Sequence, residues 1–169
     1  MSQYPIILAG IRLTADLLKA MLPLWAGKTV TTSRASTITR TADPELQLAV
    51  EANAEYTIAA YIRYSGVVAG GMSLQLTGPS GSSGSWGART INVGETAASG
   101  LSSAVRTPIG TAKDFEAIST TSAQTINISG RLITSSTAGT FSVDWAQDDS
   151  DATATAVEAD SWIELRRVA

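Results

Sequence analysis

Apolar and polar residues alternate along several stretches of this 169-residue chain. In the longest run, 55–64, every second residue is apolar, so these side chains would share one face of an extended strand. The same period of two predicts further strands at 43–51, 72–77, 125–133, 140–146 and 161–168. Short strands separated by turns predict a mostly β fold, an antiparallel β-sandwich or jelly roll.

The clearest alternation lies toward the C-terminus. The strands at 125–133 and 140–146 are separated by a short segment that contains the turn-forming residues Ser135 to Gly139. Strands joined by so short a connection commonly pair with each other. We therefore predict that these two strands form a hairpin.

The last strand has two different faces. Ile163 and Leu165 lie on one face, and Trp162, Glu164 and Arg166 lie on the other. If the two aliphatic residues face the core, Trp162 points outward, where an uncovered indole is unfavourable. We therefore predict that a neighbouring subunit covers Trp162, and that Glu164 and Arg166 pair around it across the interface.

Near the N-terminus the spacing changes from two to four. Leu13, Leu17 and Met21 recur every four residues and predict a short helix at about 14–22. A helix of this length needs an apolar surface to dock on. Its apolar face either caps the core of its own domain or anchors the chain in a neighbouring subunit.

The next stretch, 27–41, is rich in Ser, Thr and Arg and shows no period, so it predicts an extended linker. The chain is long enough for one domain of ordinary size. These patterns divide it into an N-terminal attachment segment, 1–42, and a β-sandwich domain, 43–169.

Composition excludes several classes of function. The chain has no cysteine and no histidine, which removes disulfides, thiolate metal sites and every Ser-His or Cys-His nucleophile. A net charge of −3 with three lysines supplies no basic patch for nucleic acid. No apolar run reaches the roughly 18 residues of a membrane-spanning helix, and no secretory signal precedes the first strand. We expect no nucleic-acid partner, no membrane partner and no cofactor.

Carboxylates are the remaining candidates for chemistry. The acidic segment 148–160 could offer oxygen ligands to calcium, but its spacing departs from the EF-hand pattern, so a solvated acidic turn is favoured. Asp144 could serve a glycosidase only with a second, facing carboxylate, and nothing in the sequence places one.

Aromatic residues and a glycine-rich segment suggest a sugar-binding surface as an alternative. The segment 78–85 consists almost entirely of Gly and Ser and predicts a flexible loop, with Trp86 at its exit. The candidate platform residues are Tyr61, Tyr64, Trp86, Trp145 and Trp162. Packing in the core or at an interface is favoured for them, because most occupy regular strand positions.

Longer motifs add a resemblance to a known group of proteins. They are Ile128–Thr134, Ser136–Gln147, Ser150–Thr155 and Ser161–Val168, with similar motifs at Ala9–Ala15, Asp43–Leu46 and Val50–Asn53. Together these motifs resemble virion structural proteins of tailed bacteriophages that infect actinobacteria. The resemblance implies a β-sandwich head of the tumour-necrosis-factor-like or phage-fibre kind, usually a homotrimer, attached to the particle by its N-terminal segment. The middle of the chain, 66–123, matches no motif of this group.

We therefore expect a non-enzymatic virion structural protein, either a capsid decoration or a head-fibre protein. Its expected partners are copies of itself in a homotrimer and the major capsid protein or another virion protein. Its expected location is the virion, after synthesis in the host cytoplasm. The alternatives are a tail-associated receptor- or carbohydrate-binding module that uses residues 78–86, and a carboxylate glycosidase that uses Asp144.

Overall fold

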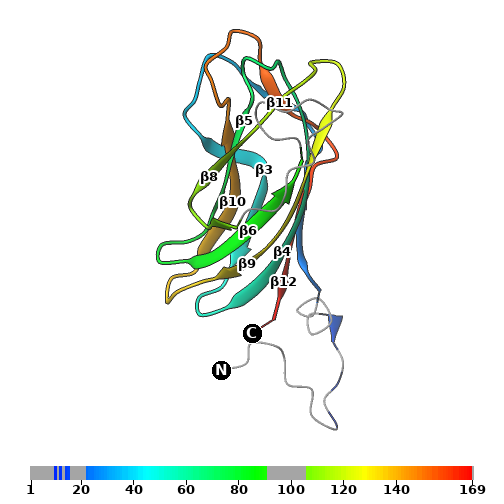
Figure 1. Cartoon of the computed structure of the whole chain (residues 1–169). Helices are drawn as coiled ribbons and strands as arrows, with labels where there is room; N and C mark the ends of the chain where they lie inside the picture. The colour runs from blue at the N-terminus through cyan, green and yellow to red at the C-terminus, as the bar shows by residue number, and fades with distance from the viewer. Residues whose placement is uncertain (1–9, 11, 13, 16–21, 91–105, 169) are drawn as a thin grey trace.

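Two antiparallel sheets pack face to face in the computed structural model, which describes residues 10, 12, 14–15, 22–90 and 106–168 (Figure 1). The first sheet has the order β1 (Leu24–Gly27), β12 (Trp162–Arg167), β4 (Glu55–Ser65), β9 (Gln124–Ile133), β6 (Ser83–Arg89) and β7 (Thr107–Pro108). In the same sheet, β11 (Thr155–Val157) pairs with β4 and with β2 (Thr32–Arg34). The second sheet has the order β3 (Thr41–Val50), β10 (Gly139–Ala146), β5 (Met72–Thr77) and β8 (Ala112–Phe115).

The strand pairing is that of a jelly roll. Without the short or inserted strands, β1 pairs with β12, β3 with β10, β4 with β9 and β5 with β8. This nesting of first with last strand is the pattern of one long hairpin wrapped around a barrel-like core. β6 and β7 are inserted between β5 and β8 and extend the first sheet beyond β9. The predicted mostly β sandwich of jelly-roll type is confirmed.

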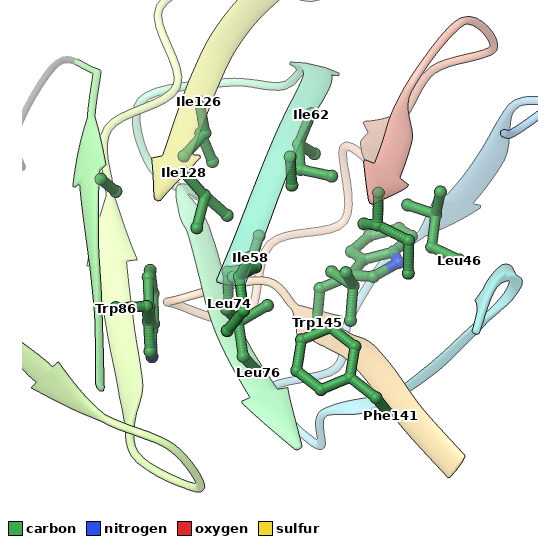
Figure 2. Packing of buried hydrophobic residues seen from close by; sticks show 14 of the residues in the cluster. Leu46, Ile58, Ile62, Leu74, Leu76, Trp86, Ile126, Ile128, Phe141 and Trp145 are labelled. Carbon is green, nitrogen blue, oxygen red and sulfur yellow. The ribbon is translucent and has the colours of Figure 1, made fainter. Parts of the chain in front are cut away.

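Alternating residues of both sheets fill the space between them. The five residues of β4 that share the predicted apolar face are all buried, as the period of two predicts: Tyr56, Ile58, Ala60, Ile62 and Tyr64. Figure 2 shows Trp86 at one end of the core and Trp145 and Phe141 at the other, with Ile58 and Leu74 between them. Each of these side chains contributes about 1.5–3 kcal/mol on burial, so the core is the main source of stability.

The predicted hairpin between 125–133 and 140–146 is wrong. β9 pairs with β4 and β6 in the first sheet, whereas β10 pairs with β3 and β5 in the second. The reason lies in Thr134, whose hydroxyl donates to the carbonyl of Glu51 at 2.7 Å and accepts from the amide of Ala54 at 2.9 Å. These bonds join the β9–β10 connection to the β3–β4 connection, so both cross from one sheet to the other.

The predicted glycine-rich loop is shorter than expected. Ser83 to Ser85 belong to β6, and Trp86 is 2 % exposed in the core. Gly84 has φ of 125°, and a Cβ there would lie 2.1 Å from the carbonyl oxygen of Arg131. Glycine therefore lets β6 approach β9 here, although its sequence resembles a loop.

The N-terminal predictions have mixed outcomes. Leu13, Leu17 and Met21 lie outside the described residues, so the helix at 14–22 and its docking stay predictions. The linker predicted for 27–41 is wrong, because the segment contains the end of β1 and all of β2, which pair with β12 and β11. The sandwich therefore begins before residue 43, while the attachment role of 1–42 stays a prediction.

Candidate self-association surface

The outer face of the first sheet carries the outward side chains of β1, β12, β4, β9 and β6. Ile163 and Leu165 are fully buried, so the intervening residues of β12 point outward. Trp25, Glu164 and Ala59 lie opposite one another on three neighbouring strands. The outward direction of Trp162, which the sequence left conditional, therefore follows from the packing of its neighbours.

Three aromatic side chains form a cluster at the β1 side of this face, defined here as Trp25, Tyr61 and Trp162. The rings of Tyr61 and Trp162 stack with centroids 6.4 Å apart and planes 21° apart. Trp162 also lies opposite Gly27 of β1. The indole of Trp25 covers Gly27, since a Cβ at that glycine would lie 2.1 Å from its Cη2 atom. The aromatic cluster is therefore continuous across three strands.

Much of the aromatic cluster faces solvent. Trp25 is 63 % exposed, and Tyr61 and Trp162 are half-buried. Leu22, 67 % exposed, lies three residues before Trp25. A shallow pocket runs between Trp25, Lys28 and Trp162. A patch of large apolar side chains around a hollow is typical of surfaces that another protein covers.

Charged residues surround the aromatic cluster. Arg63 forms an ion pair with Asp160, with Nη1 and Oδ2 2.9 Å apart. Glu164 is half-buried beside Trp25, and Arg166 is exposed opposite Thr57. Among the described residues, neither Glu164 nor Arg166 forms an ion pair. Both charges are therefore free to pair with residues of a neighbouring molecule.

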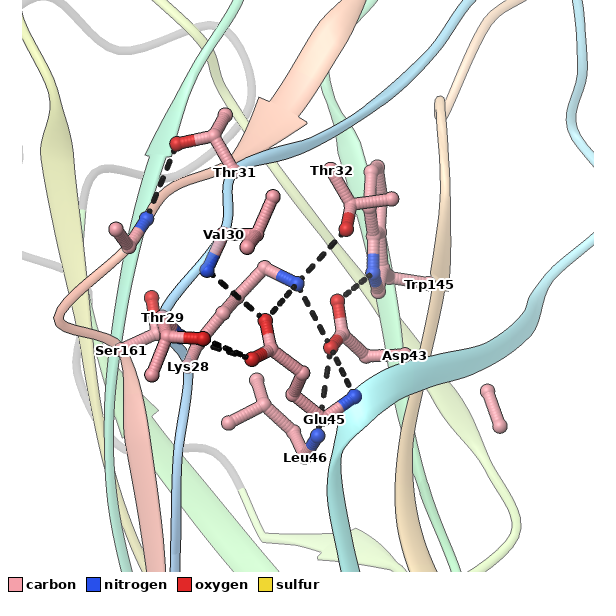
Figure 3. Close-up of polar contacts among 12 residues, drawn as sticks. Lys28, Thr29, Val30, Thr31, Thr32, Asp43, Glu45, Leu46, Trp145 and Ser161 are labelled. Atoms are coloured by element: carbon pink, nitrogen blue, oxygen red, sulfur yellow. Dashed lines mark hydrogen bonds and ion pairs between the residues drawn. The ribbon is translucent and has the colours of Figure 1, made fainter.

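A buried ion pair fixes the segment that carries Trp25. Figure 3 shows Lys28 between Asp43 and Thr32, with Nζ 2.9 Å from Asp43 Oδ1 and 2.8 Å from Thr32 Oγ1. Asp43 also accepts a hydrogen bond from Trp145 Nε1 at 3.0 Å. Because β1 belongs to the first sheet and Asp43 and Trp145 to the second, this network joins the two sheets at one edge.

Glu45 and Thr29, the residue after Lys28, complete the network. The hydroxyl of Thr29 donates to Glu45 Oε1 at 2.5 Å, and the amide of Val30 donates to Oε2 at 3.1 Å. These hydrogen bonds, that of the Thr29 side chain first, lower the pKa of Glu45 to about 2. Three consecutive residues after β1, Lys28 to Val30, are thus bound to Asp43 and Glu45 of β3.

Arg34 extends the same attachment from β2. Its guanidinium lies 4.0 Å from the ring centroid of Trp145 and donates to the carbonyl of Thr41 at 2.9 Å. Cation–π stacking and backbone hydrogen bonds favour arginine over lysine at such a site. The sequence carried no periodic signal for this network, because its members come from an apparent linker and from strands far along the chain.

The other sequence candidates occupy less promising positions. The outward-facing Asp144 of β10 accepts hydrogen bonds from Thr77 at 2.8 Å and Ser142 at 2.6 Å. Its cross-strand neighbours are Ala42 and Gln75, neither of which is a carboxylate. Glycosidase chemistry would need a second carboxylate facing Asp144, and these neighbouring strand positions supply none.

The acidic connection after β10 is held by its own hydrogen bonds. Gln147 is buried and accepts from the amide of Asp151 at 3.2 Å. Burial, and then the charges of Asp114 and Asp149, raise the pKa of Asp148. Across the part of the chain that the structure describes, no group of acidic residues is arranged to hold a metal ion. The same residues contain no helix with the length and hydropathy needed to span a bilayer.

Comparisons with known proteins assign the chain to no family. No protein-family model matches the chain, and no curated protein matches it. Two solved structures of infectious bursal disease virus, of the Gx and Gt strains, are distantly similar, with 13 % and 11 % identity and TM-scores of 0.22 and 0.18. The alignments cover 88 % and 87 % of this chain but 37 % and 40 % of those chains. Likenesses this weak carry no argument about function.

Proposed function

We propose that this chain is a non-enzymatic virion structural protein that assembles with copies of itself through the outer face of its first sheet. The observation that carries the proposal is the exposed aromatic cluster of Trp25, Tyr61 and Trp162. The resemblance of its motifs to phage virion proteins supplies the virion context. Within that context, a capsid decoration or head-fibre protein that forms a homotrimer fits best.

The physical argument starts from the cost of leaving the aromatic cluster in water. Aromatic side chains bury about 150–250 Å² each and dominate the energetics of protein interfaces. The unpaired Glu164 and Arg166 border the cluster and supply charges of both signs. Opposite charges around an apolar centre favour one register between copies over others.

The buried ion pair between Lys28 and Asp43 supports an attachment role for the N-terminal segment. It binds the end of β1, a strand of the first sheet, to β3 of the second sheet. A force applied to residues before Trp25 is therefore transmitted to both sheets. A protein that docks on a particle through its N-terminus, the major capsid protein or another virion protein being the partner, benefits from such a rigid junction.

Sedimentation velocity of the full chain and a Trp25→Ser/Trp162→Ser double variant tests the proposal. We expect the wild-type protein to sediment as one oligomer and the double variant to shift toward the monomer. A Val68→Ser variant is the matched control, because Val68 is 65 % exposed and lies in the β4–β5 connection, away from the aromatic cluster. A wild-type chain that stays monomeric at every concentration contradicts the proposal.

A tail-associated receptor- or carbohydrate-binding module is the competing proposal. Its support from Trp86 is lost, because that side chain is buried. Its remaining support is the shallow pocket beside Trp25 and Trp162. A neutral glycan that bound the wild-type oligomer and displaced no subunit would favour this alternative.

A further inference from the structure

Besides the aromatic cluster, the outer face of the first sheet carries a polar surface, on strands β6 and β9. Three cross-strand pairs face outward there: Arg89 with Asn127, Gly87 with Ser129, and Ser85 with Arg131. The inward neighbours Trp86, Ala88 and Ile128 are buried, which fixes the direction of the outward side chains. We call this surface the arginine trough.

The shape of the arginine trough follows from side-chain size. Its central pair, Gly87 and Ser129, lines two shallow hollows that meet at these residues. Long side chains stand at the two ends, Arg89 at one and Arg131 at the other. Four strand residues separate the ends, which is about 13 Å along the strand. The trough therefore has room for a short extended segment of a polymer.

Its charge is opposite in sign to that of the whole chain, whose net charge is −3. Arg106, from the segment before β7, lines the hollow at the Arg131 end and donates from Nε to Ser85 Oγ at 3.2 Å. Arg131 pairs with Glu55, and its side chain is still 56 % exposed. Arg89 and Arg106 form no ion pair with any residue in 22–90 or 106–168. Within these described ranges, no acidic side chain therefore offsets the charges of Arg89 and Arg106 at the border of the trough.

We propose that the arginine trough binds an anionic glycan, a sugar polymer that carries carboxylate or phosphate groups. Guanidinium groups bind both anions through paired N–H donors. The amide of Asn127 and the hydroxyl of Ser129 can bond to sugar hydroxyls between the anionic groups. Trp86 points into the core, and Tyr61 of β4, the cross-strand neighbour of Asn127, is the outward-facing aromatic residue at the edge of the trough.

The trough borders the aromatic cluster. Asn127 of the trough is the cross-strand neighbour of Tyr61, whereas Trp162 and Trp25 lie one and two strands farther away. The arginines of the trough lie on β6, on β9 and before β7, so replacing Arg89 and Arg106 tests glycan binding without changing either tryptophan of the cluster.

Isothermal titration calorimetry with the full-length protein tests the site. The probes are an oligogalacturonate, a glycerol-phosphate oligomer and a neutral dextran oligomer. We expect the carboxylated or the phosphorylated probe to bind and dextran not to bind, and the bound probe identifies the anion. Raising the salt from about 0.05 M to about 0.5 M should weaken binding, because exposed charges are screened.

An Arg89→Ala/Arg106→Ala double variant should lose at least about tenfold in affinity, since it removes two sources of charge-assisted hydrogen bonds to the anionic groups. An Arg40→Ala/Lys113→Ala variant removes two positive charges from residues beside or on the second sheet and should bind like the wild type. Equal binding of dextran, equal binding of a short DNA duplex, or unchanged binding by the double variant overturns the proposal. So does dissociation of the double variant into monomers, because the trough is then a contact between copies.

Discussion

Lys28 Nζ lies 2.9 Å from Asp43 Oδ1, and neither side chain is accessible to solvent. Removing one member of a buried ion pair costs about 3–5 kcal/mol, because the other charge stays buried without its partner. The two partners differ in what remains to them. Asp43 keeps hydrogen bonds from Trp145 Nε1 and from the amides of Glu45 and Leu46, whereas Lys28 keeps a hydrogen bond to Thr32 and a longer ion pair with Glu45, with Nζ and Oε2 3.6 Å apart. Removing Asp43 also leaves those three donors without their acceptor, whereas removing Lys28 does not.

From this asymmetry we expect Asp43→Ala to destabilise the protein more than Lys28→Met. The aspartate variant should lose about 3–5 kcal/mol of unfolding free energy and the lysine variant less. Urea unfolding of both variants, monitored by tryptophan fluorescence, measures the difference. Equal losses, or a smaller loss for Asp43→Ala, would contradict the assignment of the hydrogen bonds.

Glu45 should contribute to stability in acid. Its pKa is lowered from 4.5 to about 2 in the folded state, chiefly by the Thr29 hydroxyl. Because the folded pKa is the lower one, the contribution is complete above pH 4.5 and is lost as the pH falls toward 2. A Thr29→Ala variant should therefore lose less stability than the wild type over this range. Thermal unfolding at closely spaced pH values measures it, and parallel curves for the two proteins would count against it.

Gly84 and Gly110 form a matched pair of glycines with positive φ. A Cβ at Gly84 would meet the backbone of Arg131 at 2.1 Å, whereas a Cβ at Gly110 would meet nothing within 4 Å. Gly110→Ala should therefore cost only the conformational strain, about 1 kcal/mol, and Gly84→Ala more, because β6 must move away from β9. Chemical unfolding of the two variants compares them directly. Similar costs would mean that β6 can shift freely.

Replacement by alanine should lower the stability of the protein at Trp86 and weaken its self-association at Trp25. Trp86 is buried against β9, where a Cβ at Gly130 would lie 2.9 Å from the Trp86 Cβ. Trp86→Ala should cost about 3–5 kcal/mol of unfolding free energy. Trp25→Ala should leave the stability of the monomer within about 0.5 kcal/mol, because its ring is mostly exposed, and should weaken self-association. A destabilised Trp25→Ala monomer would place that side chain in the core.

Periodicity predicted the strands whose two faces differ in polarity. β4 and β9 were predicted because their apolar residues, such as Ile58 and Ile126, recur at every second position and share one face of the strand. β6 was missed because Gly and Ser dominate it, and its place beside β9 depends on the close approach that Gly84 permits. The spacing of residues within 83–89 does not show that this segment approaches β9 closely.

Pairing over long distances was the other limit. The connection at Thr134 resembled a hairpin turn, and its bonds to Glu51 and Ala54, about 80 residues earlier, decide that it crosses between the sheets. In the candidate site, the sequence predicted the outward direction of Trp162. It did not bring Trp25 and Tyr61 beside that residue, because their proximity comes from the register of three strands.

Thiol cross-linking tests the central claim, self-association through the outer face of the first sheet, most directly. The chain has no cysteine, so Glu164→Cys and Arg166→Cys each introduce a unique thiol. When the two variants are mixed and treated with a short bismaleimide, we expect a covalent dimer that contains one copy of each. A pair with cysteines at Thr140 and Asp144, on the second sheet, should give none. Equal cross-linking in the two mixtures, or none between the 164 and 166 thiols, would contradict the account.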